Sequence, residues 1–288
     1  MKRGDSIGDR MKGYYENIPK TRLVRRLPVI IRVDGKAFHT FLKGFKKPFD
    51  EILIEVMDET SKYICKNIMG AKLAYVQSDE ISILLTDYDR LNTEAYFNYE
   101  VEKICSVVAS MATLAFNKNL ARLTEEFATD VLNMPSAYNI EEERKYIETL
   151  RKAVDRGALF DARCFNIPKE EVTNYFYWRQ LDASRNSIQL VGHAYFSDAE
   201  LYKKSCNEIQ DMLVLHKGVN WNNYATYQKR GRCIVKNRIV VGSDGIIKTA
   251  VLRDTSQSES AWIIDSNIPI FKGEGREYID RLVFIGEE

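Results

Sequence analysis

Two carboxylates in this sequence stand where alternating runs of residues give way to turns. Asp34 closes one such run and is followed by Gly35, and Asp79 interrupts a second run. Two carboxylates held close together repel, and each raises the pKa of the other unless a cation lies between them. Mg²⁺ removes that cost because it takes one or two carboxylates together with phosphate oxygens. If the fold brings Asp34 and Asp79 together, we expect metal-dependent phosphoryl chemistry; if it does not, both are ordinary turn residues.

Glu80 follows Asp79 directly, and neighbouring residues of an extended strand point to opposite faces. Only one of the two carboxylates can then easily share a metal ion with Asp34. We assign Asp79 to the metal and Glu80 to a positioning role. A pair of ions about 3.5–4 Å apart can activate an attacking oxygen and stabilise a leaving oxygen.

Groups suited to phosphate binding surround these acids. The backbone N–H groups that follow Gly35, in Lys36, Ala37 and Phe38, could approach a triphosphate closely because glycine allows a tight turn. Lys46 and Lys47 add positive charge just before a predicted helix start, which itself favours anions. A solvated loop is the alternative interpretation of the two lysines.

The elements that must position these residues follow from the hydrophobic periodicity. Residues 27–34 alternate as a strand, a helix begins after Asp50 as its N-cap and ends at Gly70, and residues 71–86 form a hairpin. A second helix has an apolar stripe made by Phe97, Val101, Ile104, Val108, Met111 and Ala115. A strand at residues 159–165 completes the order βαββαβ. This order predicts an α+β protein with a ferredoxin-like core.

The remaining segments extend this core. Residues 121–157 are acidic and predict a helical insertion or a subunit contact. Beyond Pro168 we expect helices over 169–190 and 198–214, then short strands from 230 to the end. No long linker divides the chain. We therefore predict a catalytic core over residues 1–166 and a mixed C-terminal region over 167–288 that packs on it and is not an independent domain.

The composition is that of a globular cytoplasmic protein. The 288 residues are 45% hydrophobic and 29% charged, the N-terminus has no signal-like apolar segment, and no apolar run approaches the roughly 20 residues of a membrane span. Five scattered cysteines predict reduced thiols rather than disulfides or zinc. Residues 1–30 carry eight Lys/Arg against three acids and residues 203–236 carry seven against two. These basic segments either converge on phosphate or are solvated faces.

Several motifs, in order, resemble those of the tRNA-histidine guanylyltransferase family. The matching segments are Ile31 to His39, Lys47-Pro48, Tyr75 to Glu80, Lys103 with Val108-Ala109-Ser110, Phe165 near Pro168, Trp178-Arg179-Gln180, Asn220-Trp221-Asn222 and Lys229-Arg230-Gly231. They span residues 10 to 235 collinearly, and the ordered set is far more specific than any one tetrapeptide.

The resemblance implies a palm-like core, as in conventional polymerases, that adds nucleotides in the 3′-to-5′ direction. It implies two Mg²⁺ ions bound by Asp34, the backbone of Gly35 and Asp79, with Glu80 also needed for activity. ATP would activate a 5′-monophosphorylated tRNA, and the 3′-hydroxyl of an incoming nucleotide such as GTP would then attack that end. A 5′-triphosphate would bypass activation. Positioning and charge neutralisation supply most of the catalysis in such phosphoryl transfers. The family usually forms a homotetramer.

The resemblance also assigns roles to further residues. Lys47 matches a lysine important in activation. The implied nucleotide-binding residues are Arg32, Lys36, Ala37, Phe38, His39, Ser78 and Lys103. The candidates for contact with RNA or a triphosphate are Arg163, Arg179, Asn186, Lys229 and Arg230. Arg163 and Arg179 could instead be structural ion-pair partners, and His39 a structural turn residue. Trp178 and Trp221 could stack on bases, but we expect core packing for both.

One segment departs from the eukaryotic pattern. Where eukaryotic members carry His-Ile-Asn-Asn-Leu-Tyr-Asn, residues 184–190 keep a single asparagine. This resembles the guanylyltransferase-like branch, which prefers template-dependent addition and repairs truncated tRNA 5′ ends. We therefore expect templated 5′-end repair. The alternatives are strict addition of one G to tRNA-histidine, a palm-type nucleotidyl cyclase, and a non-catalytic RNA-binding protein.

Overall fold

The computed structural model describes residues 6–134, 136, 139–241, 247–250 and 260–285. Its centre is an antiparallel sheet with the strand order β4-β1-β3-β2-β5-β6, and β7 also pairs with β5. The strands are β1 (Val29–Gly35), β2 (Ala71–Gln77), β3 (Glu80–Leu85), β4 (Phe160–Asn166), β5 (Arg232–Val241), β6 (Ile247–Ala250) and β7 (Ser260–Asp265). The first four strands, with helices α3 (Glu51–Asn67) and α4 (Val101–Asn133), give the predicted βαββαβ core.

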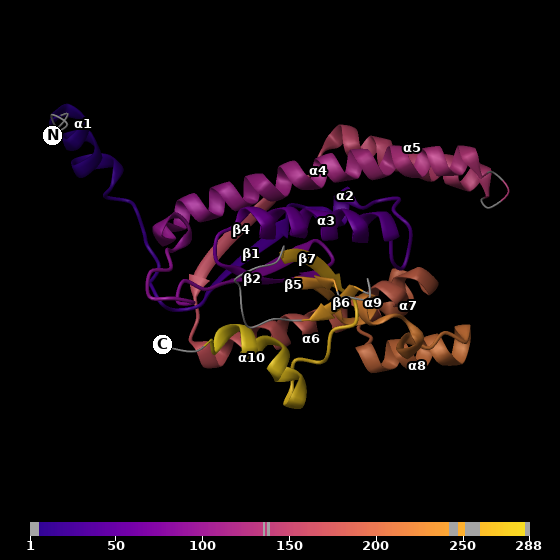
Figure 1. The fold of residues 1–288 in the computed structure, drawn as a ribbon. Coiled ribbons are helices and arrows are strands. Elements are labelled where there is room, and N and C mark those ends of the chain that lie inside the picture. Colours follow the sequence, from indigo (N-terminus) through magenta and orange to yellow (C-terminus); the bar gives the residue numbers. More distant parts are fainter. Residues whose placement is uncertain (1–5, 135, 137–138, 242–246, 251–259, 286–288) are drawn as a thin grey trace.

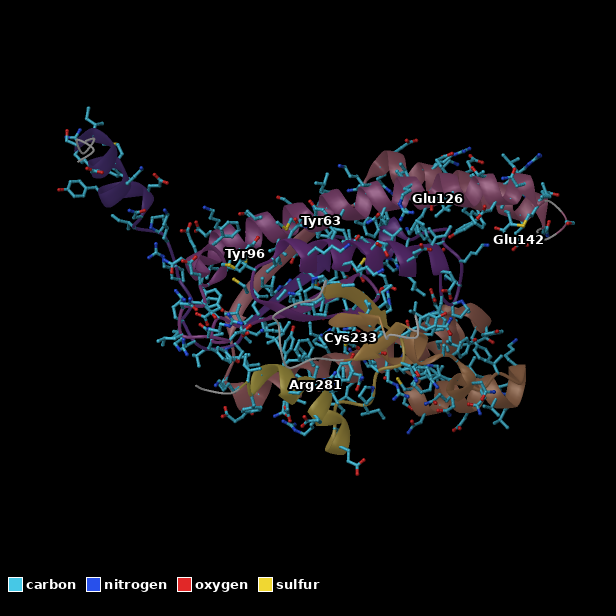
Figure 2. The ribbon with its side chains drawn as sticks, in the orientation of Figure 1. Tyr63, Tyr96, Glu126, Glu142, Cys233 and Arg281 are labelled. Carbon is cyan, nitrogen blue, oxygen red and sulfur yellow. The ribbon has the colours of Figure 1, made fainter. Side chains whose placement is uncertain are left out.

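Both faces of the sheet are buried, and strand alternation divides β1 between them. Val29, Ile31 and Val33 belong to the larger core cluster, which contains residues of α3 and α4. Ile30 belongs to a second cluster with residues of α6 (Lys169–Tyr195) and α10 (Glu277–Val283). Figure 1 shows α3 and α4 on one side of the sheet and α6 and α10 on the other. Figure 2 places Cys233 in the sheet layer between them, and this residue is fully buried.

The start of α3 is as predicted. Asp50 is its N-cap, and the carboxylate accepts a hydrogen bond from the N–H of Leu53. The predicted hairpin is β2 and β3, and the predicted last strand is β4. Because antiparallel partners place their side chains on one face, this register fixes which polar residues meet.

The predicted insertion is helical but does not begin at residue 121. Helix α4 runs through that position to Asn133, and α5 (Ile140–Arg156) returns beside it. In Figure 2, Glu126 and Glu142 lie on the outside of this helix pair. Helix α4 is long and apolar enough to cross a membrane by length and composition alone. Ten of its residues are buried, so its apolar side chains form part of the core.

The C-terminal region differs from the prediction in one helix. The helix expected over residues 198–214 is broken into α7 (Asp198–Leu201) and α8 (Cys206–Lys217), because Lys203 has a φ of 58° and Ser205 caps a new helix. The region is joined to the core directly, because β5 pairs with β2 and extends the same sheet. The remaining short helices are α1 (Ser6–Met11), η1 (Lys12–Glu16), α2 (Phe38–Phe41), η2 (Tyr96–Tyr99), η4 (Trp221–Asn223), α9 (Thr226–Arg230) and η5 (Gly273–Arg276).

Candidate active site

Three acids meet where β1 and β3 come to the same edge of the sheet. Asp34 lies opposite Glu80 in the β1–β3 register, so their side chains share a face. Asp79 lies in the two-residue turn between β2 and β3, where Ser78 has a φ of 46°. The sequence pattern predicted that Asp79 and Glu80 are neighbours in one strand and that Asp79 shares the face of Asp34, and this geometry is wrong. Glu80, and not Asp79, is the strand residue on the face of Asp34, because Asp79 belongs to the turn.

The partners of Glu80 nevertheless favour the positioning role predicted for it. Glu80 is 6% exposed, and the guanidinium of Arg179 donates to both its carboxylate oxygens at 2.8 and 2.7 Å. The hydroxyl of Ser82 donates at 3.2 Å, and Nε of Arg32 lies 3.2 Å away as an ion-pair partner. These contacts fix Glu80 and occupy its oxygens.

Arg179 is too deeply buried to contact RNA, which was one of the two roles proposed for it from the sequence. Its residue is 5% exposed, and its guanidinium also donates to Asp182 at 2.7 Å. The burial of a charge is tolerated because both acids pair with it. The alternative interpretation, a structural ion-pair partner, describes Arg179. Arg163 is different, because its side chain is 52% exposed and lies on β4 opposite Arg32.

The electrostatics of the acid pair suit a divalent cation. The pKa of Asp79 is raised to about 6, chiefly by burial and also by the charges of Asp34 and Glu80, against the lowering effect of hydrogen bonds from the Ser78 hydroxyl and the backbone. Asp34 lies 3.5 Å from Arg32 and 4.0 Å from Arg163. Although three acids meet here, no three His, Cys, Asp or Glu side chains in the described residues are arranged to hold one metal ion together, and the oxygens of Glu80 are already bound to Arg179. Carboxylate and backbone carbonyl oxygens, such as those of Asp34, Asp79 and Gly35 expected from the sequence, are the hard donors that Mg²⁺ accepts.

Gly35 is required by the turn that follows Asp34. A Cβ on Gly35 would lie 2.2 Å from the ring of Phe38, and the N–H of Lys36 donates to the carbonyl of Leu159 at 2.8 Å. That N–H is therefore not free for a phosphate. Ala37 has a φ of 56°, and the side chains of Lys36 and His39 are exposed.

Phe38 does not offer its ring to a nucleotide. The residue is 3% exposed, and its ring packs against Phe116 and Phe160 at centroid distances of 5.4 and 5.1 Å. The ring instead supports the turn at Gly35 from within the core. The nucleotide contact expected here was through the backbone N–H of Phe38, and it stays a prediction.

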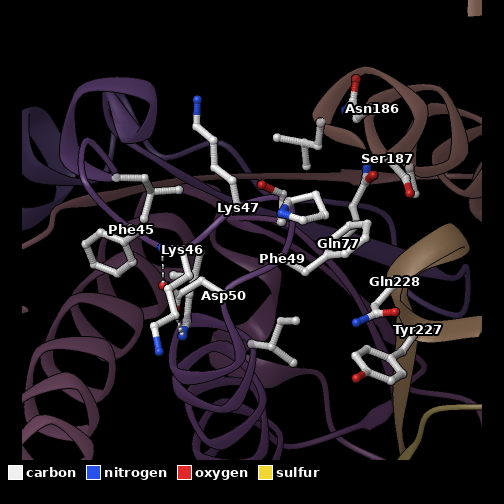
Figure 3. Close-up of a pocket in the computed structure, with 18 of the residues that line it drawn as sticks. Phe45, Lys46, Lys47, Phe49, Asp50, Gln77, Asn186, Ser187, Tyr227 and Gln228 are labelled. Atoms are coloured by element: carbon white, nitrogen blue, oxygen red, sulfur yellow. Dashed lines mark hydrogen bonds between the residues drawn. The ribbon is translucent and has the colours of Figure 1, made fainter. Parts of the chain in front are cut away.

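A cavity lies beside the turn that holds Asp79, and Figure 3 shows its lining. Lys47, Ser78 and Asn186 are among the residues that line it, as are Gln77 and Asp50. Lys47 is exposed and makes no hydrogen bond or ion pair that the described part of the chain provides; its side chain extends away from Asp50. Lys47, Ser78 and Asn186 thus come together from three separate segments, as the predicted nucleotide and phosphate contacts require.

The loop that carries Lys47 is held by helix α5. The carboxylate of Asp50 accepts from the N–H of Lys46 at 2.8 Å and from the hydroxyl of Tyr146 at 2.6 Å. The ammonium of Lys46 pairs with Glu143 at 2.7 Å and lies over the Tyr146 ring, 4.5 Å from its centroid. Lys46 is therefore a structural lysine, while Lys47 remains available to a ligand.

Gln77 also lines the cavity and was not predicted from the sequence as a site residue. This residue is 5% exposed, its Oε1 is buried, and no described residue donates a hydrogen bond to that oxygen. A buried amide oxygen without a donor is unfavourable, so a ligand in the cavity would gain by supplying one. Its position next to Ser78 in the second motif was the available signal.

Three predicted contacts lie away from this constellation. Lys103 is in the first turn of α4. The helix comes closest to the turn at Gly35 near Thr113, whose hydroxyl accepts from the N–H of Phe160, the cross-strand partner of Gly35. Lys103 is about 15 Å along the helix from Thr113. Lys229 donates to the carbonyl of Asn222 at 2.5 Å, and the carbonyl of Arg230 accepts from the hydroxyl of Tyr75. Neither Lys229 nor Arg230 lines the cavity, although their neighbours Gln228 and Gly231 do.

The two tryptophans also differ from each other. Trp221 packs in a small apolar cluster and its indole N–H donates to Ser187 at 2.9 Å, in keeping with the expected packing role. Trp178 is 51% exposed, so the expectation of core packing is wrong for it. It stands on the flank of α6, beside the buried Arg179.

Comparison with known proteins gives consistent matches. A family model described as "tRNAHis guanylyltransferase" matches residues 8–168. A solved bacterial tRNA(His) guanylyltransferase-like protein in complex with ATP is 40% identical, with a TM-score of 0.74 over 98% of this chain and 100% of that one. A GTP complex bearing the same name has a TM-score of 0.69 at 40% identity, over 97% and 100%. The tRNA(His) guanylyltransferase of Schizosaccharomyces pombe is 29% identical, covering 76% of this chain and 78% of the relative.

Proposed function

The chain belongs to the tRNA-histidine guanylyltransferase family of nucleotidyltransferases acting on tRNA, and we propose that it is a magnesium-dependent enzyme that extends tRNA 5′ ends in the 3′-to-5′ direction by copying a template. The observation that carries the proposal is the meeting of Asp34 and Asp79 beside a cavity lined by Lys47, Ser78 and Asn186. Repair of truncated 5′ ends is the physiological role that this chemistry supports.

The residues divide the reaction among them. Asp34, Asp79 and the carbonyl of Gly35 would hold Mg²⁺, which supplies charge neutralisation at the reacting phosphate. Arg32 and Arg163 add fixed positive charge next to Asp34. Lys47, free at the cavity, is placed to bind the phosphates of the ATP or GTP that activates the 5′ end. Glu80 is fixed by its buried ion pair with Arg179 and in turn holds Arg32, whose Nε lies 3.2 Å from its carboxylate.

The preference for templated addition is supported by where the departure from the eukaryotic pattern falls. Residues 184–190 lie on α6, and Asn186, Ser187 and Leu190 all line the cavity. A change in that segment therefore alters the surface that a nucleotide would meet. Assembly as a homotetramer and a cytoplasmic location rest on the resemblance and composition and stay predictions.

The test supplies a tRNA that lacks its first nucleotide and carries a 5′-triphosphate, with labelled nucleotides and Mg²⁺. Two versions of the tRNA differ only in the template base. We expect the complementary nucleotide to be added in each case, and Asp34→Ala and Asp79→Ala to be inactive. Asp155→Ala, at an exposed position on α5, is the control and should match the wild type. Addition independent of the template base, or active Asp34→Ala and Asp79→Ala variants, would refute the proposal.

Strict guanylylation of tRNA-histidine is the second candidate, because curated relatives carry that name. It predicts addition of G opposite a non-pairing base and a preference for tRNA-histidine over other tRNAs. The same assay, run with tRNA-histidine and a second tRNA, separates the two functions.

A further inference from the structure

The exposed indole ring of Trp178 has no part in the reaction proposed above. It is 51% exposed on the flank of α6, and Leu181, one turn further along, is 52% exposed. A tryptophan is the most costly side chain to leave half in water, since its apolar surface is the largest. Its position near the reacting acids suggests that a ligand covers it.

The ring is held in a fixed orientation. The guanidinium carbon of Arg179 lies 4.4 Å from the ring centroid, and the ring of Tyr175 meets it at 65° with centroids 5.8 Å apart. Arg179 is itself fixed by its bonds to Glu80 and Asp182. One side of the indole therefore rests on a rigid cation, and a planar ligand that stacks on the ring loses little further side-chain freedom.

Exposed positive charge lies on both elements next to this ring. The side chain of Arg163 is 52% exposed on β4, and that of Arg185 is 65% exposed two turns further along α6. Arg163 donates to Asp161 and lies 4.0 Å from Asp34, and Arg185 pairs with Asp182. Each guanidinium keeps further N–H groups for other acceptors. A flat apolar ring, with Arg185 on the same helix and Arg163 on the sheet face that Arg179 of α6 contacts, suits a nucleobase and its phosphates.

The contacts also set the distance of this surface from the reaction. Arg179 contacts both Trp178 and Glu80, and Glu80 lies directly opposite Asp34. Cross-strand partners are about 5 Å apart. A base stacked on Trp178 would therefore belong to the end of the RNA that reacts, and not to a distant part of the tRNA.

We propose that Trp178 is a stacking site for an unpaired nucleobase at the reacting end of the RNA substrate, with Arg163 and Arg185 contacting the adjacent phosphates. The inference rests on the proposed function for its RNA substrate. A protein partner would need a much larger contact surface than one tryptophan and one leucine. An unpaired base is favoured over a paired one because the unpaired base can leave the helical stack and lay its face on the indole ring.

The test measures RNA binding without nucleotides, so that no turnover is required. Fluorescence anisotropy would compare a labelled tRNA that lacks its first nucleotide, and so has an unpaired base, with the same tRNA carrying a fully paired blunt end. We expect Trp178→Ala to weaken binding of the first RNA about tenfold or more and of the blunt RNA much less. Trp178→Phe should keep most of the affinity. Leu181→Ala, equally exposed on the same helix, is the matched control and should bind both RNAs like the wild type.

Two further measurements keep the result decisive. GTP affinity and the melting temperature should be unchanged in Trp178→Ala, since the ring is half in water. Equal binding of the unpaired RNA by Trp178→Ala and the wild type would overturn the proposal, and so would a parallel loss for both RNAs. If Trp178→Ala does not fold, Trp178→Phe takes its place. Tryptophan fluorescence is then measured for the wild type and for Trp178→Phe as RNA is added, and RNA should quench it more in the wild type. Failure of templated extension with intact Trp178-dependent binding would count against the proposed function alone.

Discussion

At the scale of single residues, the three acids of the site differ in burial, in ion-pair partners and in pKa. Glu80 is buried, and both its carboxylate oxygens are bound by Arg179. Asp34 lies 3.5 Å from Arg32 and 4.0 Å from Arg163. Asp79 is largely buried and has a raised pKa. Asp34 and Asp79 were predictable from the sequence because both fall at strand ends. The pairing of Glu80 with Arg179 was not, since 99 residues separate them and only the packing of α6 on the sheet brings them together.

The first residue-scale prediction concerns pH and Asp79. Its pKa is raised to about 6 in the folded protein, above its ordinary value of 3.8. Its stabilising contribution is therefore present below about pH 4 and is lost as the pH rises through 6 in metal-free protein. Mg²⁺ needs the deprotonated carboxylate, so Mg²⁺ affinity should fall as the pH drops below 6.

Thermal melts at pH 5 and pH 7, with and without Mg²⁺, check this. Metal-free wild type should lose more stability between pH 5 and 7 than Asp79→Asn, and Mg²⁺ should stabilise the wild type mainly at pH 7. An identical pH dependence in the two proteins would contradict the assignment.

The second residue-scale prediction concerns Arg179. Its replacement by Met leaves the buried charge of Glu80 with Arg32 as its remaining cation, and breaking a buried pair from one side typically costs about 3–5 kcal/mol. Urea denaturation of Arg179→Met should show a loss of this size. The double variant Glu80→Gln with Arg179→Met should recover part of it, and no recovery would mean that the two side chains are not coupled.

At the scale of elements, helix α5 determines the shape of the loop that carries Lys47. Its Glu143 and Tyr146 bind Lys46 and Asp50, and Arg156 at its end donates to the carbonyl of Phe41 at 2.9 Å. The sequence predicted that residues 121–157 were helical but not what they contact. Periodicity reports the apolar face of a helix, whereas these polar contacts depend on where the helix returns.

The element-scale prediction is that Tyr146→Phe impairs nucleotide use. It keeps the ring and removes the hydroxyl that Asp50 accepts at 2.6 Å, a bond to a charged group worth about 1.5–3 kcal/mol. We expect a stability loss near the lower end of that range and a severalfold higher KM for the activating nucleotide, with a smaller change in kcat. Steady-state kinetics check this.

Glu141→Gln serves as the control on the same helix, because it breaks only an exposed pair with Lys145. It should leave both KM and stability unchanged. A less stable Tyr146→Phe with a wild-type KM would show that α5 supports the fold without shaping the loop.

At the scale of the whole molecule, one sheet contains strands of both the core and the C-terminal region. Strand β5 pairs with β2 through Val76 and Arg232, and Arg232 is buried in an ion pair with Asp58 of α3. The order βαββαβ was predictable because each element has its own periodicity. The pairing of β5 was not, because nothing in a strand's own pattern identifies its neighbour.

The whole-molecule prediction compares two truncations. Removing residues 232–288 exposes the edge of β2 and leaves Asp58 buried without its arginine, so the product should be insoluble or unfolded. Removing residues 1–16 should shift the melting temperature by only a few degrees, because none of the residues in α1 and η1 is buried. Circular dichroism melts check both, and a folded 1–231 fragment would show that the core is independent.

The pair formed by Glu80 and Arg179 also has an evolutionary consequence. Each side chain is tolerated in the interior only while the other is present, so a mutation at either position alone passes through an unstable intermediate. Lineages that descend from a common ancestor with this chain should therefore change the two positions together or not at all. The covarying positions would be Glu80 on β3 and Arg179 on α6. Because Arg179 also contacts the indole ring of Trp178, a change of the pair would remove the contact that orients this ring.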